Sequence, residues 1–181
     1  DSAIHFLCQA TQISDDICFQ MEKCDVVLCL SQSLLNIRFF ENVGIQSLLL
    51  IYNTFVACCG NVEFKSYIFS CSKNQDFLLV LYRCLENGSA KLKQQAFSIL
   101  AQIVYVLSGQ SAIDFFSSVD IVVHTEESES HVSLELHNYL QLMISMNQSP
   151  EDIVATLVIA WKFTELFDSS SPIQKEMLRE F

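Results

Sequence analysis

The sequence predicts an all-α protein, and three observations carry this prediction. Apolar residues recur at helical spacing along most of the chain. Of the 181 residues, 51% are apolar, which is enough to build a sizeable core. Only four Gly and two Pro interrupt the pattern, whereas a β-sandwich of this length would need a turn every eight to twelve residues or so. Long helices with short connections therefore fit the composition best.

The helical segments also repeat along the chain. Cys24-Asp25-Val26-Val27 returns as Val119-Asp120-Ile121-Val122, 95 residues later, and the segment 64–78 supplies a middle copy. The segment 51–60 maps onto 100–109 with a constant shift of 49 residues, and each copy closes on a glycine. Glycine is the residue that most readily takes the left-handed conformation after a helix. This pattern predicts repeated helical units.

In this pattern the chain resembles the armadillo repeat family, with HEAT repeats as the close relative. The stretch from Ser89 to Leu100 is especially similar to the third helix of an armadillo unit. The resemblance implies a right-handed α-solenoid of about three repeats with extra C-terminal helices. Each repeat would contain a short helix, a second helix and a longer third helix.

The resemblance places the repeats in residues 1–147, as a partial leading unit in 1–13 followed by full units in 14–61, 62–110 and 111–147. The first repeat would use helices 16–23, 25–35 and 42–59, and the second 62–70, 76–86 and 90–107. The third would use helices 112–118 and 132–146, with a shortened second helix from Asp120 that runs into an acidic loop, His124 to His131.

Residues 148–181 follow a different pattern and are expected to form C-terminal capping helices that continue in a longer parent protein. Ser149 is a natural N-cap, and Pro150 suits the first helical position. Ser171-Pro172 repeats this start signal for a final helix. Trp161 stands at helical spacing from Ile153 and Leu157, which predicts a core position, with a binding hot spot as the alternative.

The formal charge of −11 and the pI near 4.6 disfavour direct nucleic-acid binding, because no Lys/Arg cluster offers a contact surface for phosphates. The acidity serves solubility or steers a basic partner. The segment from Val43 to Cys59 is the nearest to a membrane span, but polar residues interrupt it. We expect a buried helix there, and no membrane.

Eight cysteines lie among apolar residues in the first half of the chain: Cys8, Cys18, Cys24, Cys29, Cys58, Cys59, Cys71 and Cys84. Free Cys behaves as a small core hydrophobe, so reduced thiols in the nucleus or cytoplasm are expected. Their spacing does not match the two to four residues or so that separate zinc ligands in a knuckle. We expect neither disulfides nor a metal.

No motif in the sequence points to catalysis. A glycine-rich phosphate loop, a G-x-S-x-G elbow, an H-E-x-x-H helix and paired C-x-x-C motifs are all missing from the sequence. A cysteine nucleophile would need a nearby histidine, and nothing selects one from His5, His124, His131 and His137. The sequence therefore predicts neither an enzyme nor a cofactor.

The armadillo resemblance implies a groove lined by third helices, in which amide side chains bond the backbone of an extended peptide. The amide position matches four residues, in chain order Gln9, Asn53, Gln102 and, more loosely, Gln141. An amide suits a peptide backbone because it offers both a donor and an acceptor. The companion groove tryptophan is replaced by Leu49 and Ser98. The alternative is that these amides form an ordinary polar helix face.

The sequence thus predicts a non-catalytic scaffold that binds a peptide or helix of a partner protein. A larger nuclear or chromosome-associated assembly is an extension of this hypothesis. A mean hydropathy of +0.33 with 14 Phe leaves apolar surface available for a partner. The alternatives are a purely structural segment of a longer α-solenoid and, more distantly, an enzyme with an unrecognised site.

Overall fold

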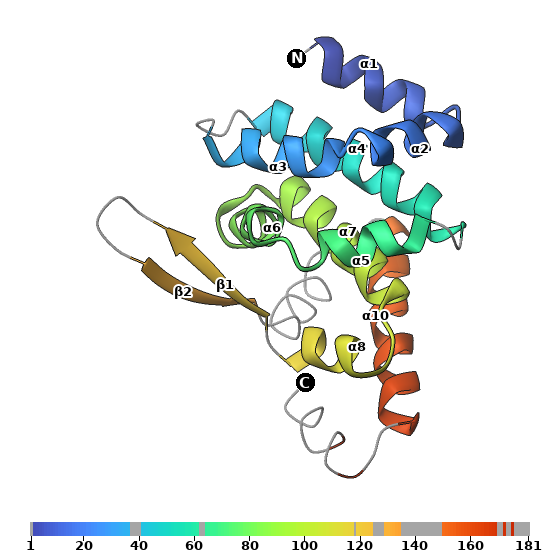
Figure 1. The fold of residues 1–181 in the computed structure, drawn as a ribbon, viewed down its shortest axis with the longest axis vertical. Coiled ribbons are helices and arrows are strands. Elements are labelled where there is room, and N and C mark those ends of the chain that lie inside the picture. Colours follow the sequence, from blue (N-terminus) through green and yellow to red (C-terminus); the bar gives the residue numbers. More distant parts are fainter. Residues whose placement is uncertain are drawn as a thin grey trace. The chain divides into compact units, whose positions relative to one another are not determined.

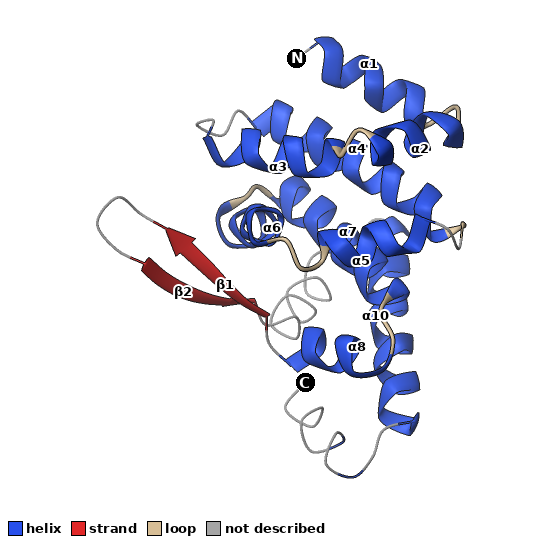
Figure 2. Cartoon of the chain, in the orientation of Figure 1, coloured by secondary structure: helices blue, strands red, loops and turns tan. Residues whose placement is uncertain are grey.

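The computed structural model describes residues 2–36, 41–61, 64–117, 119–124, 129–134, 150–169, 172 and 175. Most of these residues are helical, which confirms the predicted helical class (Figure 2). The chain divides into two compact units, Asp1–Val106 and Leu107–Phe181, and each is described by itself.

The first unit contains seven helices among its described residues, coloured blue to yellow-green in Figure 1. Their bounds are α1 Ser2–Thr11, α2 Asp15–Lys23, α3 Val26–Asn36, α4 Glu41–Cys59, α5 Lys65–Cys71, α6 Gln75–Asn87 and α7 Ala90–Val106. The helices α2 to α7 lie within three residues of the predicted ranges, which is close to the ordinary uncertainty of helix ends.

Local signals explain several of these boundaries. The Asn74 side chain accepts a hydrogen bond from the Phe77 N–H at 2.9 Å and so caps the start of α6. The first turn of α2 carries Asp15 and its last turn carries Lys23, which suits the helix dipole. Asp25 turns the chain between α2 and α3 with φ of 55°, a left-handed conformation that Asp tolerates better than most residues.

The long helix α4 is the centre of the first unit. It packs against α1, α2, α5 and α7, while α3 packs against α6. In Figure 1, α1, α4 and α7 succeed one another from the top of the view downward, with α4 in the middle. Phe55 on α4 is fully buried, and its ring contacts Phe77 edge-on at 5.8 Å and Tyr67 at 6.5 Å between centroids. This aromatic cluster joins α4 to α5 and α6.

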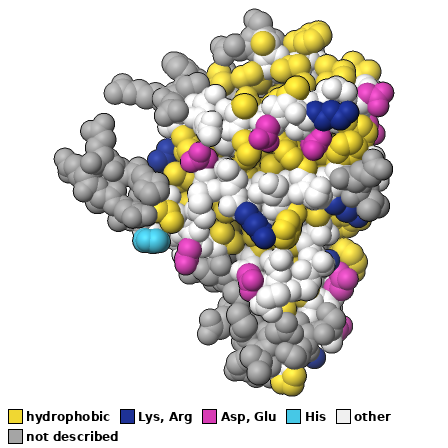
Figure 3. All heavy atoms as spheres, in the orientation of Figure 1, with side chains coloured by type: hydrophobic (Ala, Val, Ile, Leu, Met, Phe, Trp, Pro, Cys, Tyr) yellow, Lys and Arg dark blue, Asp and Glu magenta, His cyan; other side chains and the backbone are white. Residues whose placement is uncertain are grey.

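Among the described helices, the segment Asn42–Cys59 of α4 is long and apolar enough to cross a membrane, judged by length and composition. The central helix of a protein core has the same properties. In this structure 56% of that segment is buried inside the protein, where it packs against neighbouring helices. On the face shown in Figure 3, acidic and basic side chains are scattered between hydrophobic ones.

The second unit combines helices with a β-hairpin. Its elements are α8 Gly109–Ser117, β1 Val119–His124, β2 Glu129–Leu134 and α10 Pro150–Ser169. The strands pair antiparallel, with Ile121 opposite Val132 and Val119 opposite Leu134. Helix α8 contacts both β1 and α10. The predicted start of α10 at Pro150 is confirmed, whereas most of the final helix predicted after Ser171 falls outside the described residues.

The hairpin corrects the expected second helix of the third repeat. It also replaces the expected loop with strand at His124 and at 129–131, while residues 125–128 lie outside the described residues. Residues 119–123 are β-branched at four of five positions, and Ile121 is buried while its neighbour Asp120 is exposed. This alternation is the pattern of a strand that is half buried. The helix predicted over 132–146 is also wrong at its start, since 132–134 belong to β2, and the rest lies outside the described residues.

Candidate functional site

The predicted amide residues occupy different environments. Gln9 is exposed on α1, whereas Asn53 on α4 and Gln102 on α7 are half-buried. Gln141 lies outside the described residues. The three amides that the structure describes each have a hydrogen-bond partner within the chain.

Asn53 bonds the end of helix α1. Its Nδ2 donates to Oγ1 of Thr11, the last residue of α1, over 3.1 Å. The Thr11 hydroxyl is buried and donates in turn to the Cys8 carbonyl oxygen at 3.0 Å. Cys18 on α2 completes the cluster, since its Sγ lies 3.7 Å from the carbonyl oxygens of both Thr11 and Asn53. The cluster joins α1, α2 and α4.

Gln102 makes a comparable contact between α4 and α7. Its Oε1 accepts a hydrogen bond from Sγ of Cys59, the last residue of α4, over 3.3 Å. An amide of each long helix thus contacts the last residue of an earlier helix, Asn53 of α4 with Thr11 of α1 and Gln102 of α7 with Cys59 of α4. An amide has two donor hydrogens and two acceptor lone pairs, so one intramolecular bond leaves it capacity for a partner.

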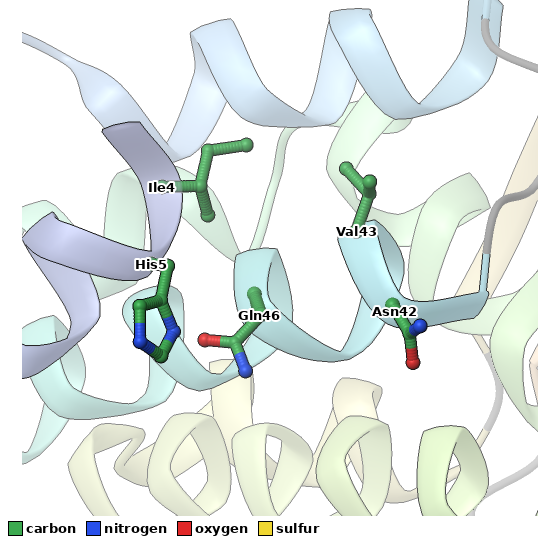
Figure 4. Close-up of a pocket in the computed structure, with 5 residues that line it drawn as sticks. All are labelled: Ile4, His5, Asn42, Val43 and Gln46. Atoms are coloured by element: carbon green, nitrogen blue, oxygen red, sulfur yellow. The ribbon is translucent and has the colours of Figure 1, made fainter. Parts of the chain in front are cut away.

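A surface pocket lies between α1 and α4, beside Gln9. It has a volume of about 290 Å³, and its lining residues come from both helices: Ile4, His5, Asn42, Val43 and Gln46. Figure 4 shows the His5 ring and the Gln46 amide near one another, with the Ile4 and Val43 side chains above them. The lining therefore pairs aliphatic groups with three polar side chains.

Two hydrogen bonds position this lining. The exposed Nε2 of Gln9 lies 3.1 Å from Nε2 of His5, one helical turn away. Because an amide nitrogen only donates, the imidazole accepts at Nε2. On the inner side, Sγ of the buried Cys8 donates to the carbonyl oxygen of Gln46 at 2.9 Å and ties α1 to α4.

The pocket is suited to recognition of a small group. Its volume of about 290 Å³ lies just below the ~300 Å³ at which the usual range for ligand pockets begins, so one side chain or a small molecule fits. Apolar walls with a few polar groups are the usual lining of such sites. Gln9 was predicted as a binding residue, whereas His5, Asn42, Val43 and Gln46 were not, because the pocket exists only where α1 packs on α4.

The buried thiols do not form a nucleophilic centre. Burial raises the pKa of Cys18 and Cys59 to about 11 and of Cys58, Cys71 and Cys84 to about 12. The pKa of Cys8 is also raised by burial. These six thiols stay protonated near neutral pH, where a nucleophile must be a thiolate. All eight cysteines are unpaired.

Side chains that could bind a metal do not come together within the described part of the chain. No group of three or more His, Cys, Asp or Glu side chains there could hold a metal ion. His124 and His131 lie on different strands, His124 opposite Glu129 and His131 opposite Val122. His137 lies outside the described residues.

Trp161 corrects a prediction from the sequence. It was expected in the core, but its side chain is exposed, as are Ile153 and Leu157 on the same helix. The buried face of α10 is formed instead by Ala155, Ile159, Lys162 and Leu166. The sequence correctly predicted that these residues share one face of a helix, but it assigned the wrong face to the core. The two could not be told apart because α10 carries apolar residues on two opposite sides.

No protein-family model, curated protein or solved structure matches this chain. The armadillo resemblance therefore stays a prediction.

Proposed function

We propose that the chain is a non-catalytic scaffold, a right-handed α-solenoid in residues 1–106 at least, that binds a peptide of a partner protein at the α1/α4 pocket. The observation that carries the proposal is the pocket itself, whose aliphatic walls and polar rim adjoin Gln9. An apolar side chain of the peptide enters between Ile4 and Val43. The Gln9 and Gln46 amides then face its backbone, as donors and acceptors suited to an extended chain.

The recurrence of buried positions supports the solenoid part of the proposal. Ile51 and Leu100, which stand 49 residues apart, are both fully buried on the two long helices. Phe55 and Val104 form a second buried pair at the same distance. The contacts of α4 with α7 and of α3 with α6 have the same spacing along the chain. Stacked repeats of this kind bury their cores against their neighbours and leave extended surfaces for partners.

The proposal extends to the cellular compartment of the protein and to the charge of its partner. Eight unpaired thiols suit a reducing compartment, so the nucleus or cytoplasm is the expected place. The net charge of −11 favours a basic partner and disfavours nucleic acid. The proposal needs no cofactor, and α4 serves it as a core helix outside any membrane.

A purely structural role in a longer solenoid is the second candidate, and α1 gives the observation that favours it. Phe6 on α1 is 66% exposed, and Ile13 in the turn that follows α1 is 84% exposed. Apolar side chains at such positions suit a face that a neighbouring helix covers. In that case α1 would be an internal element of the stack, and the pocket beside it would bind no peptide.

Selection from a random peptide library displayed on phage separates the two candidates. The immobilised wild-type chain is the target, and the library is first depleted on a Val43→Phe variant, in which the larger ring fills the pocket. The scaffold proposal expects enriched peptides that share an apolar residue and bind the wild type at least ~10-fold more tightly than Val43→Phe, the result of losing one buried anchor. Failure to enrich peptides, or equal affinity for the two proteins, would favour the structural role.

A further inference from the structure

The second unit carries an apolar surface that its own core does not use. On α10 four large apolar side chains are exposed: Ile153 by 47%, Val154 by 60%, Leu157 by 61% and Trp161 by 55%. The buried residues Ala155, Ile159 and Leu166 lie on the other side of the same helix. A surface helix normally keeps one apolar face and turns a polar one to water. Contiguous apolar surface of this kind marks an interaction site.

The exposed residues form a ridge of the kind that packs helices together. Ile153, Leu157, Trp161 and Glu165 follow one another at intervals of four residues along α10. Rows with this spacing fill the grooves of a second helix in the commonest mode of helix packing. The apolar part of the ridge is roughly 12 Å long at 1.5 Å per residue, about two helical turns. Its tryptophan is of the residue class that most often anchors an interface.

The shape of the surface selects a helical partner. An extended peptide lying on this convex face would leave backbone N–H and C=O groups against apolar side chains, where they lose their bonds to water. A helix satisfies its backbone internally and presents only side chains. The ridge therefore suits the apolar face of an amphipathic helix.

The charge around the ridge selects a basic partner. Among the α10 side chains that the structure describes, the charged ones are Lys162, Glu165 and Asp168. Lys162 is buried and pairs with Glu165 at 3.2 Å, whereas Asp168 is exposed seven residues after Trp161, on the same side of the helix. A second copy of this chain would bring the same acidic end and a net charge of −11, and like charges disfavour such a pair.

We propose that the exposed ridge of α10, Ile153, Leu157 and Trp161, docks an amphipathic helix that carries Lys or Arg beside its apolar face. Trp161 packs into the groove of that helix, and Asp168 faces its basic residues. This site lies in the second unit and does not depend on the peptide pocket of the first.

Trp161 also reports on the site, because it is the single tryptophan of the chain. The probe is a tryptophan-free synthetic helix of Leu and Lys with all Leu on one face. The proposal expects a saturable shift of the Trp161 emission to shorter wavelength as the ring leaves water. Leu157→Asp should raise the dissociation constant at least ~10-fold, and Asp168→Lys should raise it ~3- to 10-fold at low salt, through loss of charge complementarity. Far-UV circular dichroism of each variant checks that α10 remains folded, and Leu157→Ser provides a milder change at the same position.

Five controls make the outcome decisive. A scrambled peptide of the same composition keeps the charge and loses the apolar face, so equal binding by that peptide would overturn the proposal. Equal binding by a version with Glu in place of Lys would overturn the charge argument. If the emission maximum shifts with protein concentration alone, a second copy of the chain is the occupant. If acrylamide cannot quench the Trp161 ring in the free protein, the chain covers its own ridge. Val43→Phe should leave the titration unchanged, which separates this site from the proposed peptide pocket.

Discussion

Asn53 and Thr11 connect helices α4 and α1 through one hydrogen bond, in which Nδ2 of Asn53 donates to the buried Thr11 hydroxyl over 3.1 Å. Forty-two residues separate them in sequence, so the bond exists only when α1 and α4 are packed together. The Thr11 hydroxyl lies away from water, and removal of its donor leaves an acceptor without compensation. The amide predicted to bind a partner thus has a structural role as well.

The first prediction is that Asn53→Ala lowers the free energy of unfolding by about 1–2 kcal/mol. Thr11→Val removes the same bond from the other side, and the double variant should cost less than the sum of the two because the residues share one interaction. Urea denaturation of the four proteins gives the coupling energy. Additive single effects would show that the bond contributes nothing to stability.

The hydrogen bond between Cys59 and Gln102, which joins α4 to α7, should contribute less to stability. Cys59 donates to Gln102 Oε1 at 3.3 Å, and a thiol is a poor donor. We expect Gln102→Ala to lower the free energy of unfolding by about 0.5–1 kcal/mol, less than Asn53→Ala. Gln9→Ala, which removes an exposed amide, should change it by less than about 0.5 kcal/mol. Equal losses for all three amides in urea would contradict the distinction between junction amides and surface amides.

Phe55 should be among the most costly residues to truncate. It is fully buried on α4 and contacts rings on α5 and α6, so Phe55→Ala leaves a cavity and is expected to cost about 3–5 kcal/mol. The matched control is Phe6→Ala, which removes the same side chain from an exposed position on α1. Thermal denaturation should show a large drop for the first variant and a small one for the second. Similar drops would place α1 in a more buried setting than described.

The buried thiols predict a loss of stability at alkaline pH. Burial raises the pKa of Cys84 from 9.0 to about 12 in the folded protein. Below pH 9 the thiol is protonated in both states and its contribution to stability is complete. As the pH rises from 9 toward 12 the unfolded state loses the proton first, so folding becomes less favourable. Cys84→Val should make the decline in the free energy of unfolding over this range shallower, and an unchanged slope would contradict the assignment.

The sequence predicted helices well where periodicity and caps agree. The helix predicted over 76–86 matches α6 within one residue at each end, and α4 follows from its long apolar pattern. The strand β1 has a signal in the sequence, since residues 119–123 are β-branched at four of five positions, but the recurrence of the 24–27 pattern at 119–122 favoured a helix there. The local preference of β-branched residues for a strand decided the structure of this segment, against the repeat pattern.

The site was harder to predict because it depends on contacts between distant residues. His5 and Gln46 line one pocket although 41 positions separate them, and no local pattern brings them together. The spacing of Trp161 could not distinguish the core face of α10 from the exposed one, because both faces carry apolar residues. Composition alone could predict that apolar surface would be left over, without giving its location.

Titration of a display-selected peptide against two matched variants of α4 tests the scaffold proposal most directly. Val43→Phe fills the α1/α4 pocket, whereas Val56→Phe adds the same ring at an exposed position roughly 20 Å further along the same helix. Fluorescence anisotropy of the labelled peptide gives the dissociation constants. The proposal predicts a rise of at least ~10-fold for Val43→Phe and wild-type affinity for Val56→Phe. Unchanged affinity in Val43→Phe, or an equal loss in both variants, would contradict peptide binding at this pocket.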